Sequence, residues 1–160
     1  MAVDMFMKLE GIEGESKDKA HAGEIDILAW SWGLASTGTS DLGGGGGQGK
    51  VSVQDLSFTH KHDKASPNLM LYCCDGKPVK EALLTVRKPG GEKLEFLKIT
   101  MTDVIITSVS VGGSSGENEM TENVSLNFAK VKQEYTEQLP DGTGGAAVEA
   151  CWNIEQNAPE

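Results

Sequence analysis

The stretch from Val51 to Gly76 constrains the fold most, because it predicts a strand that leads into a short capped helix. The residues from Val51 to Thr59 are rich in the β-branched and aromatic side chains that favour strands. Their apolar alternation slips by one residue at Gln54 and Asp55, which predicts a bulge in that strand.

Ser66 and Pro67 predict where the helix begins. Serine is favoured as an N-cap, and proline suits the first helical position because it has no N–H to leave unpaired. Gly76 supplies the left-handed residue that commonly ends a helix. We therefore predict a helix of about two to three turns, with Leu69 and Cys73 on its apolar side.

Most of the remaining chain alternates apolar and polar residues, as half-buried strands do. Residues 148–154 show the clearest alternation. Residues 94–111 are long enough for one strand with a bend, because the alternation changes phase between Met101 and Val104. The other segments expected to be strands are residues 3–9, 24–34, 51–59, 82–86 and 124–135.

About seven or eight strands with one helix are typical of an antiparallel barrel or sandwich. The predicted fold class is therefore mainly β: a small antiparallel β-barrel of two packed sheets, with one short α-helix on its side and a long glycine-rich loop. A chain of 160 residues is the size of one domain, so we expect a single domain over residues 1–160.

The segment from Glu24 to Leu34 is expected to form the second strand. Four large apolar residues recur at every second position and are predicted to face the core. Ser31 lies between two of them and is therefore expected on the opposite face. The four apolar residues are Leu28, Trp30, Trp32 and Leu34.

The segment from Ser36 to Gly49 contains nine glycines or serines, and Leu42 is its only large apolar residue. It predicts a long flexible loop between two strands, because this composition cannot build a packed core. Gly44, Gly49 and Lys50 also match most of a phosphate-binding loop. That motif requires a Ser or Thr after the lysine and the start of a helix, whereas Val51 begins a strand. No nucleotide or other cofactor is therefore expected.

His60 and His62 would share one face of a continuing strand, where Asp63 could help them to hold a metal. No third ligand follows at helix or hairpin spacing, and Lys61 and Lys64 flank the pair. These neighbours favour a solvated strand end, so no metal is expected. Neither a nucleophile motif nor a paired acid and base is visible in the sequence. We therefore predict no catalytic residue from the motifs.

The charge balance of 24 acidic against 14 basic residues gives a net charge of −10, which disfavours nucleic acid as a partner. The first residues lack the basic and apolar segments of a signal peptide or a membrane span. Three cysteines, two of them adjacent, fit neither a disulfide framework nor a metal site and indicate a reducing compartment. The residues alone leave two classes: a structural subunit, or a β-barrel that binds or hydrolyses a carbohydrate or small ligand.

One segment begins Phe-Thr-His-Lys-His-Asp-Lys-Ala-Ser-Pro-Asn-Leu at Phe58 and ends at Gly76. It resembles the strand-to-helix segment of the haemolysin-coregulated protein (Hcp) family, which forms the tube of bacterial type VI secretion. The resemblance covers nearly the whole chain and is weakest in the C-terminal tail. Its other segments are Asp4 to Phe6, Gly14 to Asp18, Glu24 to Ile27, Trp30 to Gly33 and Thr121 to Phe128.

The resemblance implies a tube subunit without enzymatic activity rather than a ligand-binding or hydrolytic barrel. The expected partners are five further copies in a homohexamer, stacked rings, a spike protein, a contractile sheath and small effector proteins in the lumen. Assembly is expected in the cytoplasm, followed by secretion without a signal peptide and without membrane insertion. Ser31 is a candidate lumen-facing residue. The candidate ring-stacking loop contains Gly38, Leu42, Gly43, Gly44, Gly45, Gly46, Gly47 and Gly49.

Overall fold

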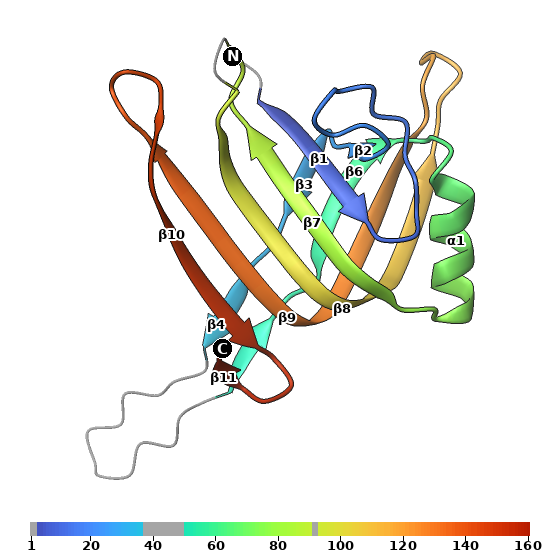
Figure 1. Cartoon of the computed structure of the whole chain (residues 1–160). Helices are drawn as coiled ribbons and strands as arrows, with labels where there is room; N and C mark the ends of the chain where they lie inside the picture. Colours follow the sequence, from blue (N-terminus) through green and yellow to red (C-terminus); the bar gives the residue numbers. More distant parts are fainter. Residues whose placement is uncertain (1–2, 37–49, 91–92) are drawn as a thin grey trace.

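A computed structural model describes residues 3–36, 50–90 and 93–160 (Figure 1). These residues form mostly strands, with one helix, α1 (Ser66–Asp75), on the side of the sheets. The strands are β1 (Asp4–Leu9), β2 (Ile25–Asp26), β3 (Ala29–Ser31), β4 (Leu34–Ser36), β5 (Val51–Val53), β6 (Leu56–Lys61), β7 (Val79–Arg87), β8 (Glu95–Gly112), β9 (Thr121–Gln138), β10 (Gly144–Asn153) and β11 (Ala158–Pro159).

Two long strands, β8 and β9, each of 18 residues, organise the sheets. Their first and last parts have different neighbours. In what we call the first arm, the start of β8 pairs with β7, and the end of β9 pairs with β10. The other halves join a second arm, in which β9 pairs with β6 and β6 pairs with β3. All these pairings are antiparallel, and the two arms pack on each other. The predicted fold class is thus confirmed.

The bend predicted between Met101 and Val104 is present in β8. Asp103 there has a φ of 54°, in the left-handed region that non-glycine residues rarely adopt. On the partner strand, Phe128 and Ala129 are both buried although they are consecutive, so β9 changes its inward face at the same level. The bend directs both arms toward one core, whose largest fully buried side chains include Met7, Phe58, Leu84, Ile99 and Leu126.

The predicted second strand, residues 24–34, is wrong as a single element. The chain pairs with β1 at β2, with β6 at β3 and with β5 at β4. Because the backbone turns between these pairings, side chains at every second position do not all face the same side. Leu28 and Leu34 are 48% and 55% exposed. Trp30 and Trp32 are partly buried and pack against the core as expected.

The irregularity at Gln54 and Asp55 is a break between strands rather than a bulge. The chain leaves β4 as its partner after β5 and takes up β3 and β9 at β6. The hairpin between β9 and β10 is closed by backbone hydrogen bonds of its own. Leu139 and Gly142 close it with backbone hydrogen bonds to Thr143 and Leu139 of 2.8 Å each.

A network of charged side chains ties the loop after β1 to the first arm. The buried Arg87 guanidinium donates two hydrogen bonds to Asp18, at 3.0 and 2.6 Å, and one to Asp4 at 2.9 Å. The hydrogen bonds from Arg87 hold the pKa of the Asp18 carboxyl well below its usual range. His21 lies 2.8 Å from Glu24 and 2.6 Å from Glu95 through its two ring nitrogens.

The start of α1 differs from its prediction, whereas its end agrees. Ala65 is the N-cap and makes no side-chain capping bond. Instead, the Asp63 carboxylate accepts a hydrogen bond from Ala65 N–H at 2.9 Å, and Ser66 Oγ accepts one from Asp63 N–H at 3.1 Å. Pro67 lies in the first turn as expected. Gly76 ends the helix in the left-handed conformation, with a φ of 69°.

Ser66→Ala removes the acceptor of the Asp63 N–H at a buried position. We expect the free energy of unfolding to fall by about 1–3 kcal/mol, the cost of leaving a buried donor unpaired. Denaturant unfolding at one fixed protein concentration measures the change. Asn68→Ala, at an exposed position of the same helix, is the control and should change it by less than about 0.5 kcal/mol. Equal stability of the two variants would contradict this account.

Candidate functional surfaces

The outer face of the second arm carries a row of four serines. Strand register places Ser31 of β3 opposite Ser57 of β6, Ser57 opposite Ser125 of β9, and Ser125 opposite Ser108 of β8. The hydroxyls of Ser57 and Ser125 are 3.0 Å apart. Ser31 is exposed on this face, away from Trp30, as its alternation predicts.

The neighbouring row on the same face is also uncharged. Ala29, Thr59, Asn123 and Ser110 lie opposite one another across the same four strands. The Thr59 hydroxyl donates a hydrogen bond to Asn123 Oδ1. The two rows thus form a surface, here called the hydroxyl face, that offers hydrogen bonds and no formal charge.

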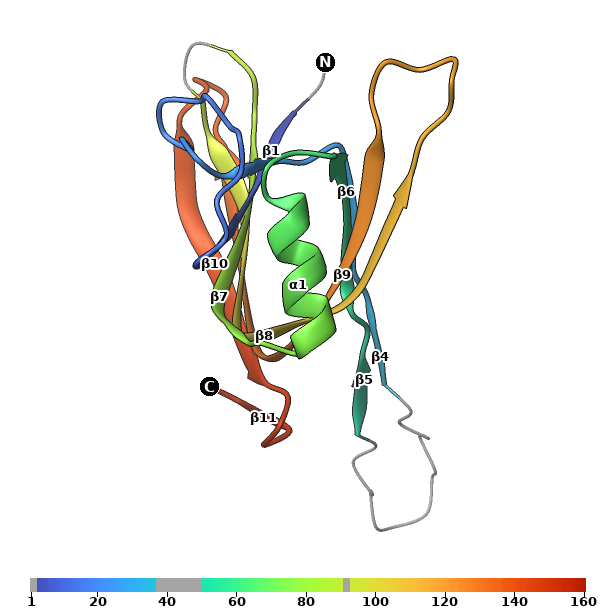
Figure 2. The same cartoon turned by 90° about the vertical axis from the view of Figure 1, so that its right-hand side faces the viewer.

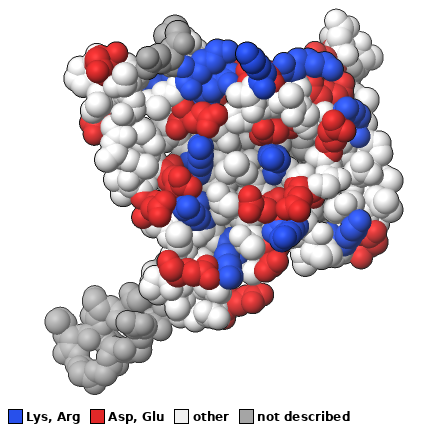
Figure 3. Space-filling model, viewed as in Figure 1, with Lys and Arg blue, Asp and Glu red and all other residues white. Residues whose placement is uncertain are grey.

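The outer face of the first arm is chemically different, because it mixes charges of both signs (Figure 3). Lys132 Nζ lies between Glu134 at 3.3 Å and Glu149 at 3.4 Å, and Lys98 pairs with Glu95 at 3.3 Å. Burial raises the pKa of Glu95, but hydrogen bonds with His21 and Lys98 outweigh it, and the pKa is below its ordinary value. Because its side chains are charged and paired, this face can stay exposed to water without a partner molecule to cover it.

The inner side of β10 is apolar, and the described residues leave the part around Val148 uncovered. Val148 is 72% exposed although its alternation predicts a half-buried strand, and Tyr135 opposite it on β9 is 49% exposed. Between Gly144 and Cys151, β10 pairs with β9 on one edge and with no other described strand. We call this region the β10 overhang.

A cleft of about 320 Å³ adjoins the overhang, beneath the ribbon formed by β4 and β5. Its walls are mostly apolar and come from the ribbon on one side and the first arm on the other. They consist of Trp32, Leu34, Val51, Val53, Val131, Gln133, Ala150, Cys151 and Trp152.

The opposite side of the molecule carries a second apolar groove. It lies between α1 and the end of β8, has a volume of about 490 Å³, and includes the exposed Met70 and Val111. Figure 1 shows α1 and β10 on opposite sides of the sheets. Its full lining is His62, Ser66, Pro67, Met70, Cys73, Cys74, Val109, Val111 and Glu122.

The histidines considered as metal ligands have separate surroundings. His60 is fully buried and its Nε2 lies 2.7 Å from Glu122 Oε1, while its Nδ1 lies 3.8 Å from Asp63. His62 is exposed, because β6 ends at Lys61 and the strand geometry does not continue. Within residues 3–36, 50–90 and 93–160, no three His, Cys, Asp or Glu side chains come together as metal ligands.

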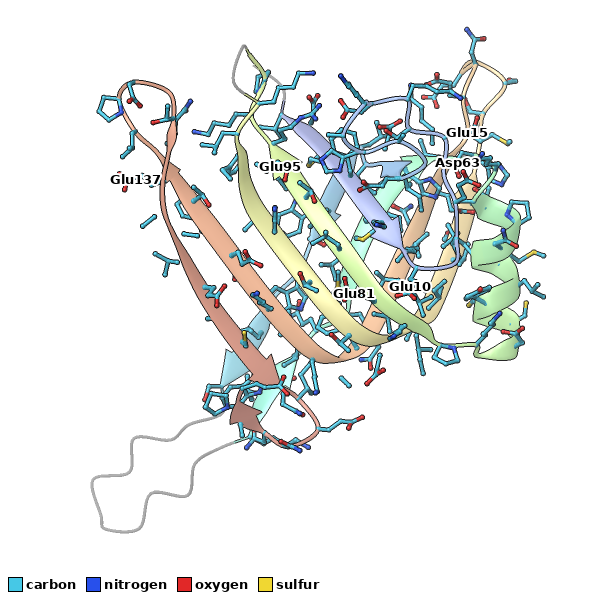
Figure 4. All side chains as sticks on the ribbon, in the orientation of Figure 1. Glu10, Glu15, Asp63, Glu81, Glu95 and Glu137 are labelled. Carbon is cyan, nitrogen blue, oxygen red and sulfur yellow. The ribbon has the colours of Figure 1, made fainter. Side chains whose placement is uncertain are left out.

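The carboxylates around His60 interact with one another. Burial raises the pKa of Asp63, and the nearby Glu15 and Glu122 add to the rise, although the Ala65 N–H bond and His60 oppose it. Figure 4 shows Glu15 and Asp63 near each other beside the start of α1. The Glu15 carboxylate also accepts a hydrogen bond from Lys64 N–H at 2.8 Å, which joins the loop after β1 to the helix.

The ring-stacking residues proposed from the sequence, from Gly38 to Gly49, lie outside the described residues. The phosphate-loop match lies there too, apart from Lys50. The overhang was missed because alternating apolar residues look the same whether their own chain or another molecule covers them.

The sequence matches the family model described as "Type VI secretion system effector, Hcp" over residues 6–135. The chain belongs to the Hcp family. It is 57% identical over 159 residues to Protein hcp1 of Pseudomonas aeruginosa, with 98% of both chains covered.

Solved structures of Hcp proteins share the fold. The crystal structure of Hcp1 from Salmonella typhimurium has a TM-score of 0.84 at 42% identity and is matched over 100% of both chains. A structure described as a type six secretion system protein reaches 0.92 at 26% identity, with 99% of this chain and 100% of that chain covered. The chain is thus a tube protein of type VI secretion. The described residues contain no helix long and apolar enough to cross a bilayer.

His60→Ala leaves the buried Glu122 carboxylate without its partner. We expect a loss of roughly 3 to 5 kcal/mol in the free energy of unfolding, the usual cost of removing one partner of a buried ionisable pair. His62→Ala, at the exposed neighbouring histidine, is the control and should be nearly neutral. Urea unfolding at matched protein concentration compares them, and similar midpoints would show that the pair is unimportant.

Proposed function

We propose that six copies of this chain form a ring and that rings stack into a hollow tube. The observation that carries the proposal is the β10 overhang, an apolar face beside an open strand edge. The whole chain, residues 1–160, acts as one domain with a structural role and no catalytic one. The tube assembles in the cytoplasm, leaves the cell with the spike under the force of the sheath, and carries small effectors in its lumen.

The ring contact is head to tail, with the β10 overhang of one copy meeting the α1 side of the next. Ring closure by a repeated contact requires two different patches on each subunit. The overhang and the α1 groove are both apolar and lie on opposite sides of the molecule. An open edge strand with an apolar face is also a strong site for association.

Val148→Glu introduces a charge into the β10 overhang and should prevent ring formation, because an unpaired carboxylate would be buried at the contact. Ala147→Glu adds the same charge one residue away, on the opposite face of β10, and is the matched control. Native mass spectrometry should show monomers for the first variant and six-fold assemblies for the second. Rings formed by both variants would exclude this contact, and a monomeric wild-type protein would exclude the ring itself.

The hydroxyl face is proposed to line the lumen, with Ser31 among its residues. An uncharged surface rich in hydroxyls can contact varied effectors without selecting them by charge. Ser31→Gln adds bulk to the serine row and should reduce effector co-purification several-fold, while rings remain. Glu149→Gln places the same side chain on the charged face of the first arm and should leave co-purification unchanged. Equal retention of effectors by the two variants would show that Ser31 does not face the lumen.

The loop from Gly38 to Gly49 is proposed to join one ring to the next, with Leu42 as its apolar anchor. Leu42→Asp, or removal of Gly43 to Gly46, should leave rings intact and abolish tubes and secretion. Native mass spectrometry reports the rings, and electron microscopy reports the tubes. Long tubes from the deletion variant would make the loop a linker only.

A further inference from the structure

The ribbon of β4 and β5 continues past β3 and β6 at the end of the molecule where β11 also lies, as the side view in Figure 2 shows. It is a separate two-stranded sheet, paired from Leu34 with Val53 to Ser36 with Val51. An isolated two-stranded ribbon is marginally stable in water. Its direction must therefore be set where it joins the sheets.

Backbone and indole hydrogen bonds make one half of this joint. Gln54 N–H donates to the Gly33 carbonyl at 2.9 Å, which ties together the two chain segments that enter and leave the ribbon. The Trp32 indole N–H donates to the Gln54 carbonyl, also at 2.9 Å. The Trp32 ring contacts the buried Phe128 ring at 6.2 Å between centroids, so the crossing is anchored on the core.

Asp55 makes the other half. It follows Gln54 directly and precedes β6, at the break where the chain changes partners. Its carboxylate accepts a hydrogen bond from Thr107 Oγ1 at 2.6 Å and another from Asn127 Nδ2 at 2.9 Å. Thr107 is the residue at which the β8–β9 register shifts. One carboxylate thus connects the break before β6 to the irregularity in β8 and to β9.

We propose that Asp55 is a positioning residue that fixes the direction in which the β4–β5 ribbon leaves the sheets. Its bonds are made by side chains at the surface, whereas backbone ladders and the core hold the strands themselves. Losing the carboxylate therefore releases the ribbon without unfolding the sheets. A further consequence, which rests on the proposed tube, is that a fixed ribbon meets the neighbouring ring in one orientation.

Hydrogen-exchange mass spectrometry of the assembled protein tests the direct claim. Asp55→Ala should speed exchange in residues 50–56 by at least about tenfold, because it removes two charge-assisted hydrogen bonds and the loss of one already corresponds to that factor. Exchange in β7 should not change. Asp55→Asn should restore slow exchange. The oxygen of the new amide accepts from Asn127, and its N–H donates to the Thr107 hydroxyl. That hydroxyl can then donate to the Ser125 carbonyl, which lies 3.2 Å from it in this structure.

Two further variants sharpen the test. Thr107→Val keeps the shape of the side chain without its hydroxyl and should reproduce part of the Asp55→Ala effect. Asp141→Ala is the matched control, since Asp141 accepts two hydrogen bonds from Thr143 in the distant β9–β10 hairpin. Unchanged exchange in the ribbon of Asp55→Ala, or equal acceleration in β7, would overturn the proposal.

Electron microscopy tests the consequence separately. Asp55→Ala is expected to give rings of normal mass and fewer, shorter tubes than Asp55→Asn. Normal tubes with a loosened ribbon would overturn the link between ribbon direction and stacking. Absence of rings from the wild-type protein would defeat the proposed function, and the exchange comparison would still decide the role of Asp55.

Discussion

The bend shared by β8 and β9 is the constraint on which the rest of the structure depends. Their pairing runs from Leu97 with Tyr135 to Gly112 with Thr121, and it persists through the positive φ of Asp103 and the register shift near Thr107. Because both strands change their inward face at the same level, one pair serves two arms. Each arm can then close the core against the other without a separate set of strands.

The same bend separates the chemistry of the outer surfaces. The ends of the two strands nearest β6 present serines, threonine and asparagine, whereas the ends nearest β7 and β10 present paired lysines and glutamates. It also leaves β10 outside the area that the second arm can cover. A lumen lining, a hydrated exterior and a subunit contact would therefore follow from one strand pair.

Local signals in the sequence predicted the features that depend on neighbouring residues. The alternating strands, the phase change before Val104 and the glycine after α1 all follow from backbone preferences over a few positions. Leu28 and Leu34 were assigned to the core, and residues 148–154 were expected to be half-buried, because alternation reports an apolar face and not what covers it. The helix start was misassigned because the Ser66 hydroxyl accepts from Asp63 N–H, upstream of the helix, and does not cap the N–H groups of the first turn. The serine row could not be foreseen, since it depends on register between strands far apart in the chain.

The exposed Val148 beside an unpaired strand edge also bears on the newly synthesised protein. A free subunit shows the kind of surface that drives irregular aggregation, and in the proposed ring another copy would cover it. A net charge of −10 slows such encounters, because every copy repels every other. Only a contact with enough complementary apolar area overcomes this repulsion. The acidic composition therefore favours ordered assembly over non-specific aggregation.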